Sequence, residues 1–140
     1  MCFFAAAQNP EKFKFLILMA PEVDLKAKFE RNPNINIAQW RTNGVIEYQN
    51  AAGGTDFRQY KLYEDAQRYN PWAVAKNIKC PTIIIHGDND QTIPLAQSQR
   101  LQREISGATL VTLSDCGHTF YKSGKLDAAL MVIDNWLDQR

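Results

Sequence analysis

The chain has 140 residues, of which 45% are hydrophobic and 22% charged, and this length and composition fit one ordinary soluble domain. Its 16 basic and 15 acidic side chains give a net charge of +1, and the basic residues are scattered along the chain. This pattern argues against a dedicated nucleic-acid binder and against a protein that binds anionic membranes. No apolar run approaches the roughly 20 residues that cross a bilayer, so the expected partner is a small molecule.

Two apolar segments open the chain. Residues 1–9 are apolar on every side until Asn9 and Pro10 stop them, which predicts the end of a buried helix. Residues 13–19 form a nearly continuous apolar run that Pro21 closes. A run of this kind is typical of a strand that is covered on both faces.

Residues 25–70 differ in composition from the rest of the chain. They contain turn-forming pairs such as Asn43-Gly44, and aromatic side chains are frequent among them. The pattern is compatible with a surface excursion that has its own small helical core around residues 57–69. It is equally compatible with a cap-like insertion over a binding site, and this is the prediction that we carry forward.

The remaining segments alternate between strand and helix. Residues 82–86 predict a buried strand, the spacing after Pro94 predicts an amphipathic helix that Gly107 ends, and residues 108–113 predict another strand. Together these elements predict an α/β fold with a mostly parallel sheet of about three strands, flanked by helices. A closing helix is expected to bury an apolar stripe formed by Leu126, Leu130, Ile133 and Leu137.

The loops that follow the two later strands carry the titratable residues. Ligands and catalytic groups collect at the carboxyl ends of parallel strands. Asp90 lies in the first of these loops, and His118 lies 28 positions later, in the second. An acid and a histidine so placed suit a nucleophilic triad, in which the carboxylate accepts the Nδ1 proton and Nε2 takes the proton of the nucleophile.

The segment from Pro81 to Pro94, taken together with Gly117-His118, resembles the acid and histidine segments of α/β-hydrolases. In that family the order along the chain is nucleophile, acid, histidine. The resemblance implies that Asp90 is the catalytic acid and His118 the catalytic base. It further implies that His86 is structural and that Asp88 is a loop or capping carboxylate.

Two further segments extend the resemblance. Residues 5–21 resemble the helix after the family's nucleophile elbow and the strand that follows, and residues 62–72 resemble cinnamoyl or feruloyl esterases. The chain has no Gly-x-Ser-x-Gly sequence, and the resemblance places that serine before Met1, together with the amides of the oxyanion hole. Residues 1–140 are therefore expected to be the C-terminal portion of an α/β-hydrolase domain. Self-association through the exposed edge of the strand at 13–19 is a further expectation.

No residue of the chain is expected to replace the missing serine. Cys2 lies on a helix without a glycine-rich turn, Cys116 stands too close to His118 on one tight loop, and Ser98 and Ser114 are interpreted as ordinary helix or loop residues. The three cysteines are odd in number and lack metal-ligand spacing. Free thiols in a reducing compartment, the cytoplasm, are the prediction.

The resemblance implies a serine-dependent carboxylic ester hydrolase that acts on a small-molecule ester and needs no metal or organic cofactor, with activity of this chain alone in doubt. Two alternatives stay open. One is a non-catalytic binding module, a truncated or pseudo-hydrolase. The other is a phosphatase, because Asp88-Asn-Asp-Gln-Thr92 partly matches the Asp-x-Asp-x-Thr signature of haloacid-dehalogenase-type enzymes. There Asp88 would be the nucleophile and Mg²⁺ the partner.

Overall fold

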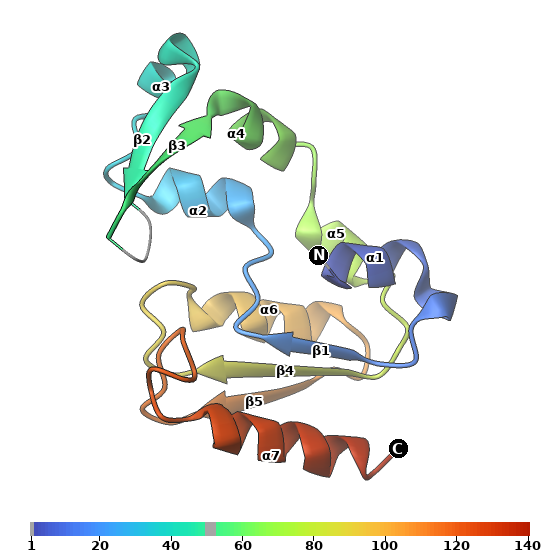
Figure 1. Ribbon diagram of the computed structural model, residues 1–140. Helices are drawn as coiled ribbons and strands as arrows, with labels where there is room; N and C mark the ends of the chain where they lie inside the picture. Colours follow the sequence, from blue (N-terminus) through green and yellow to red (C-terminus); the bar gives the residue numbers. More distant parts are fainter. Residues whose placement is uncertain (1, 50–52) are drawn as a thin grey trace. The chain divides into compact units, whose positions relative to one another are not determined.

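The computed structural model describes residues 2–49 and 53–140. The chain divides into two compact units (Figure 1). The sheet unit comprises the chain up to Val23 and from Pro71 to Arg140, and the insert unit comprises Asp24–Asn70. Within the described ranges, no helix is long and apolar enough to span a membrane.

The sheet unit is built on three parallel strands in the order β1-β4-β5, namely β1 (Leu16–Met19), β4 (Thr82–Gly87) and β5 (Thr109–Leu113). This confirms the predicted α/β fold with a parallel sheet flanked by helices. The strand predicted at 13–19 begins only at Leu16, whose N–H donates to the Pro81 carbonyl at 2.9 Å. Pro81 has no N–H, so it cannot extend the ladder toward residue 13.

The central strand β4 is covered on both faces. All six of its residues are buried, and successive side chains point to opposite faces of the sheet. Ile84 packs into one core cluster, whereas Ile83 and Ile85 pack into the other. The unbroken apolar run in the sequence therefore reflects a strand that has no exposed face.

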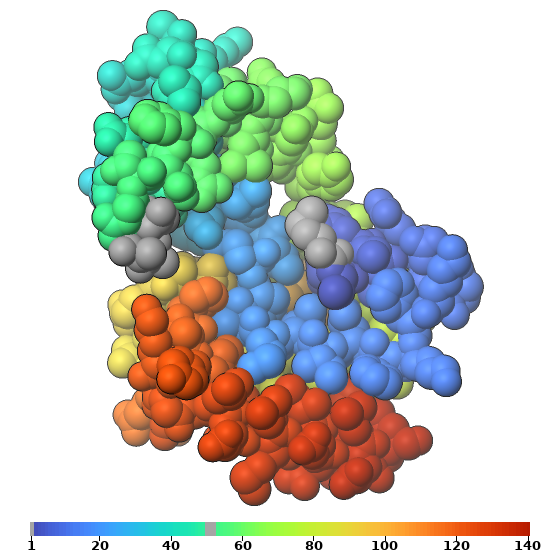
Figure 2. All heavy atoms as spheres, in the orientation of Figure 1, coloured from blue at the N-terminus to red at the C-terminus, as the bar shows by residue number. Residues whose placement is uncertain are grey.

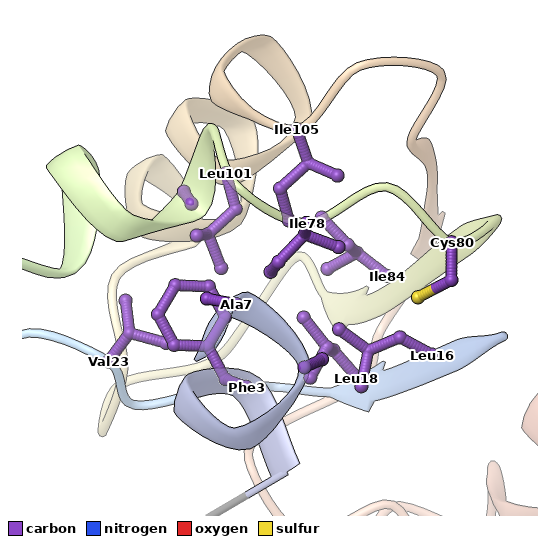
Figure 3. Packing of buried hydrophobic residues seen from close by; sticks show 12 residues of the cluster. Phe3, Ala7, Leu16, Leu18, Val23, Ile78, Cys80, Ile84, Leu101 and Ile105 are labelled. Carbon is purple, nitrogen blue, oxygen red and sulfur yellow. The ribbon is translucent and has the colours of Figure 1, made fainter. Parts of the chain in front are cut away.

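Helices cover each face of the sheet (Figure 1). On one face lie α1 (Cys2–Gln8), α5 (Pro71–Ala75) and α6 (Leu95–Glu104), and a short 3₁₀ turn, η1 (Pro10–Lys12), follows α1. Figure 3 shows the core between these helices and the sheet. Its buried members are Phe3, Ala6, Ala7, Leu16, Leu18, Val23, Ala75, Ile78, Cys80, Ile84, Leu101 and Ile105.

Helix α1 is less buried than its composition predicts. Phe3, Ala6 and Ala7 are buried, but Cys2 is exposed. Residues three and four positions apart share one side of a helix, so the sheet covers only that side. The predicted buried helix is therefore confirmed on this side only, and Cys2 and Gln8 are exposed.

Helix α7 (Leu126–Leu137) covers the other face, and Ile133 and Leu137 of the predicted stripe pack against the core there, partly buried. Ala129 and Trp136 are its buried residues, whereas Leu126 and Leu130 are 36% and 46% exposed. The helix is apolar over more than one face, so spacing alone does not say which face meets the sheet. The small side chain of Ala129 lets that face approach the sheet closely.

The insert unit has its own aromatic core, formed by Phe29, Trp40 and Tyr63. Its elements are α2 (Leu25–Arg31), α3 (Ile37–Asn43), the antiparallel pair β2 (Val45–Gln49) and β3 (Thr55–Gln59), and α4 (Tyr60–Ala66). The helical core expected around residues 57–69 is wrong in part, since Phe57 and Tyr69 are 73% and 55% exposed. The paired strands were not predicted, because their residues alternate between exposed and half-buried and carry little apolar signal.

Local sequence sets the ends of the insert unit's first two helices. The carboxylate of Asp24 accepts the Ala27 N–H, and the side chain of Asn36 accepts the Gln39 N–H, both at 3.0 Å. Each bond satisfies a donor that the first turn of a helix leaves unpaired. Gly44 ends α3 in the left-handed region, with φ of 73°, which glycine adopts without strain.

Candidate active site

The loops after β4 and β5 leave the sheet side by side. Gly87 and Leu113 are register partners at the ends of these parallel strands, and the two loops lie at the same end of the sheet (Figure 1). Backbone bonds continue beyond the strands, from the Asp88 N–H to the Leu113 carbonyl and from the Asn89 N–H to the Cys116 carbonyl, both at 3.0 Å. The loop after β5 reaches the surface of the sheet unit, where it is orange in Figure 2.

Close contact between the loops requires glycine at position 87. A Cβ atom on Gly87 would overlap the carbonyl group of Cys116 and come within 2.9 Å of its Cβ. No side chain fits without moving one loop away from the other. Gly87 thus keeps the acid and histidine loops in contact.

Asp90 lies in the first loop with its side chain fully buried, at 0% exposure. Its Oδ1 accepts the backbone N–H groups of Thr92 and Ile93, each at 2.8 Å. Its Oδ2 accepts the Nδ1–H of His118 at 2.9 Å. The structure therefore brings the two residues singled out in the sequence into direct contact, with the carboxylate held from both of its oxygens.

His118 is oriented by this contact and by its own loop. Its side chain is 40% exposed, and within residues 2–49 and 53–140 no group bonds its second ring nitrogen, Nε2. Because an ionised carboxylate only accepts hydrogen bonds, Nδ1 carries the ring proton and Nε2 is left as the basic nitrogen. The loop is fixed beside the histidine, where the Gly117 N–H donates to Ser123 Oγ at 2.9 Å.

The environment of Asp90 keeps its carboxylate ionised. Burial acts to raise the pKa, but hydrogen bonds from the Ile93 N–H, from His118 and from the Thr92 N–H together outweigh it. The net result is a pKa below the ordinary value of 3.8. An ionised acid at this position stabilises the positive charge that an imidazole gains when it takes a proton.

This lowered pKa predicts a pH-dependent contribution to stability. A carboxyl whose pKa is lower when folded stabilises the fold above its unfolded pKa, and this stabilisation disappears as the pH falls through the folded pKa. The wild type is therefore expected to exceed Asp90→Asn in free energy of unfolding at about pH 7, with the difference shrinking steadily below about pH 4. Urea unfolding at a series of pH values checks this. A difference that stays constant from about pH 7 to about pH 3 would contradict it.

The other candidate carboxylate, Asp88, has a structural role. Its Oδ1 accepts the backbone N–H of Cys116 at 3.4 Å, which ties the first loop to the second. Cys116 is completely buried, and this burial raises the pKa of its thiol. A buried thiol with a raised pKa is a poor nucleophile, whereas Cys2 is exposed at the first residue of α1.

Ser98 is not the ordinary helix residue that the sequence indicated. It is fully buried on α6, and its Oγ lies 2.6 Å from Nδ1 of His86, which is itself fully buried. Ser98 lies three residues before the buried Leu101, on the same face of α6. This spacing was a signal of burial, and a buried hydroxyl needs a hydrogen-bond partner. Ser114 is exposed.

Comparison with known proteins gives the family. The model of the prolyl oligopeptidase family matches residues 1–140. The chain belongs to this family. The resemblance to α/β-hydrolases that the acid and histidine segments indicated is thereby confirmed, and the structural neighbours agree with it.

Solved structures match the fold across nearly the whole chain. Alpha/beta hydrolase domain-containing protein 10 from mouse is similar with a TM-score of 0.79 and 19% identity, over 99% of this chain and 57% of that protein. Est1E from Butyrivibrio proteoclasticus is similar with a TM-score of 0.70 and 18% identity, over 95% of this chain and 55% of that protein. At these identities the likeness concerns the fold alone. The chain spans little more than half the length of these two structures.

A curated relative matches part of the chain. The pimeloyl-[acyl-carrier protein] methyl ester esterase of Aromatoleum aromaticum is 32% identical over 62 residues, which are 44% of this chain and 25% of that protein. Esterases and lipases thus recur among the similar proteins, which also include a monoacylglycerol lipase from Paleococcus ferrophilus.

Proposed function

We propose that this chain supplies the acid and the base of a serine-dependent carboxylic ester hydrolase. Asp90 is the acid and His118 the base, and the serine nucleophile is supplied by chain outside these 140 residues. The observation that carries the proposal is the 2.9 Å bond from His118 Nδ1 to Asp90 Oδ2, made between the ends of neighbouring parallel strands. This placement and geometry suit the orienting half of a nucleophilic triad.

The chemistry follows from the tautomer that Asp90 imposes. The serine oxygen attacks the ester carbonyl carbon while Nε2 of His118 takes the serine proton, and the carbonyl bond opens to an oxyanion. His118 then gives this proton to the leaving alcohol as the ester C–O bond breaks. Water repeats the sequence on the acyl-serine, which releases the acid and restores the serine. Asp90 stays ionised throughout and stabilises the imidazolium.

The insert unit, Asp24–Asn70, is proposed to be the cap of this hydrolase. It joins the chain between β1 and β4 and packs its own core around Phe29, Trp40 and Tyr63. Because the unit has an independent core, its surface residues can be substituted without disturbing the loops that carry Asp90 and His118. Substrate selection is the role that this independence favours.

The family match favours a peptide bond as a second candidate substrate. The family takes its description from a prolyl oligopeptidase, and ester and amide hydrolysis share the same triad chemistry. A comparison of a p-nitrophenyl ester with a prolyl p-nitroanilide separates the two, because each releases a coloured product. We expect the ester to be the better substrate, on the strength of the esterase and lipase relatives.

A fluorophosphonate probe, which reacts with activated serines, tests the proposal. Intact mass should show no adduct on the 140-residue chain and one adduct on a longer protein that joins the same chain to its Gly-x-Ser-x-Gly segment. An adduct on the 140-residue chain would place the nucleophile within it. A longer protein that neither reacts nor hydrolyses either substrate would overturn the proposal and favour the non-catalytic binding module.

The phosphatase alternative is not favoured. Asp88, its required nucleophile, accepts the Cys116 N–H and so holds the two loops together. Asp90 is occupied by two backbone N–H groups and His118. The family match over the whole chain is a further argument against it. Phosphatase activity that vanished on addition of a chelator would restore this alternative.

A further inference from the structure

His86 is a buried polar side chain that the proposed chemistry does not use. It stands on β4 directly after Ile85 and has no exposed surface. A buried imidazole needs a partner for each ring nitrogen, because an unpaired polar group inside a protein is costly. The partners that it has are therefore informative about its role.

The contacts of His86 define which nitrogen carries its proton. Nε2 lies 3.0 Å from the backbone carbonyl oxygen of Ile93, and Nδ1 lies 2.6 Å from Oγ of Ser98. A carbonyl oxygen only accepts, so Nε2 carries a proton and donates it to Ile93. In the neutral ring, Nδ1 then accepts the hydroxyl proton of Ser98.

Through Ile93, His86 is connected to the proposed acid. The Ile93 carbonyl accepts from His86, while the Ile93 N–H donates to Oδ1 of Asp90 at 2.8 Å. Nε2 of His86 also lies 3.3 Å from Oδ2 of Asp90, the same oxygen that accepts from His118. Both the carbonyl and the N–H of Ile93 are thus held by hydrogen bonds. The Nε2–H of His86 points the positive end of its dipole toward the Asp90 carboxylate.

We propose that His86 is a positioning residue: its Nε2–H group fixes the backbone of Ile93, and thereby holds the Asp90 carboxylate where it accepts the Nδ1 proton of His118. Ser98 is compatible with this role, because its hydroxyl donates to Nδ1 when the ring proton is on Nε2. This inference rests on the proposed function, because the acid and base are those of the hydrolase.

A purely structural role for His86 and a positioning role predict different results for its replacement. If His86 only fills space in the core, its replacement lowers stability but leaves the tautomer of His118 unchanged. If it positions Asp90, loss of the Nε2 donor weakens the hold on the carboxylate, and the His118 ring is freed to carry its proton on Nε2. The tautomer of His118 is therefore the measurement that separates the two roles.

Two amide variants isolate the Nε2 donor. The terminal amide of glutamine reaches the place of Nε2, whereas the shorter asparagine amide reaches only the place of Nδ1. His86→Gln therefore keeps a donor for the Ile93 carbonyl, and His86→Asn removes it. Ile84→Val is the matched control, because it removes a methyl group on the same face of β4, two residues before His86, and leaves the Ile93 and Asp90 contacts in place.

Long-range ¹H–¹⁵N correlation spectra of the neutral rings report which nitrogen carries the proton. His86 and His118 are the chain's two histidines, so the spectrum of the 140-residue chain holds two imidazoles. We expect His118 protonated at Nδ1 in the wild type, in His86→Gln and in Ile84→Val, and shifted toward the Nε2–H form in His86→Asn. In the longer protein with its serine, His86→Asn should lower kcat by about 10- to 100-fold, with KM little changed.

Several outcomes would overturn the proposal. An unchanged His118 tautomer in His86→Asn would leave His86 with a packing role only, and equal changes in the glutamine and asparagine variants would remove the role assigned to the Nε2 proton. If neither variant folds, the wild-type spectrum still decides, because a His86 ring protonated at Nδ1 contradicts the proposal. These readouts need no turnover, so failure of the hydrolase proposal is recognised separately, by the fluorophosphonate result.

Discussion

Replacement of His118 by alanine should lower kcat by roughly 10⁴-fold or more in a protein that joins this chain to its serine, because no other group takes the serine proton. Asp90→Asn should lower kcat by about 10³- to 10⁴-fold, since an amide at that position no longer enforces a proton on Nδ1. KM should change little in either variant. Initial rates with a p-nitrophenyl ester measure both effects.

The control for these variants lies on the same loop as His118. Asp115 is exposed, and its φ of 54° is in the left-handed region that asparagine also tolerates. Asp115→Asn removes a carboxylate near the site without touching the Asp90 contact, so the rates should be those of the wild type. Full activity in His118→Ala would refute the assignment of the base, and a similar loss in Asp115→Asn would point to general disruption of the loop.

A second large effect is expected for Gly87→Ala. The added methyl group overlaps the Cys116 carbonyl, so the β4 and β5 loops must separate and lose the bonds that join them. We expect a loss of roughly 3 kcal/mol or more in the free energy of unfolding, because an overlap with backbone is not relieved by rotation of a side chain. Urea unfolding of the 140-residue chain measures this loss.

Gly107→Ala provides the comparison for this substitution. Gly107 has φ of 73° and open space around its would-be Cβ, so alanine meets backbone strain there but no overlap. Its cost should be about 1 kcal/mol. Equal losses at positions 87 and 107 would show that close contact between the loops is not what requires glycine at position 87.

The sheet and its loops could be predicted because the signals were local. The run Ile83–Ile85 is buried on both faces, and Asp90 and His118 lie in the loops that follow strands which the parallel topology places side by side. The contact between their side chains is a consequence of that topology. The pattern of strands and helices therefore predicted the sheet, and the loops after its strands predicted the pair of residues.

The features that were missed depend on tertiary packing. In α7, Ile133 and Leu137 pack against the core as predicted, but the buried residues are Ala129 and Trp136 rather than Leu126 and Leu130. Ser98 was interpreted as an ordinary helix residue, and only its distance to His86 in the folded chain shows that it has a buried partner. In the insert unit, the strands β2 and β3 owe their pairing to backbone bonds rather than to an apolar pattern.

The position of the insert unit in the chain bears on the order in which the protein folds. Leu16 of β1 pairs with Thr82 of β4, so the contact between β1 and β4 closes a loop that contains the whole insert unit. Loop closure costs conformational entropy that grows with the length of flexible chain. Early collapse of the Phe29, Trp40 and Tyr63 core would shorten that flexible length, and β1 would then find β4 sooner. The unit proposed to select the substrate would thus also speed the assembly of the sheet that carries the acid and the base.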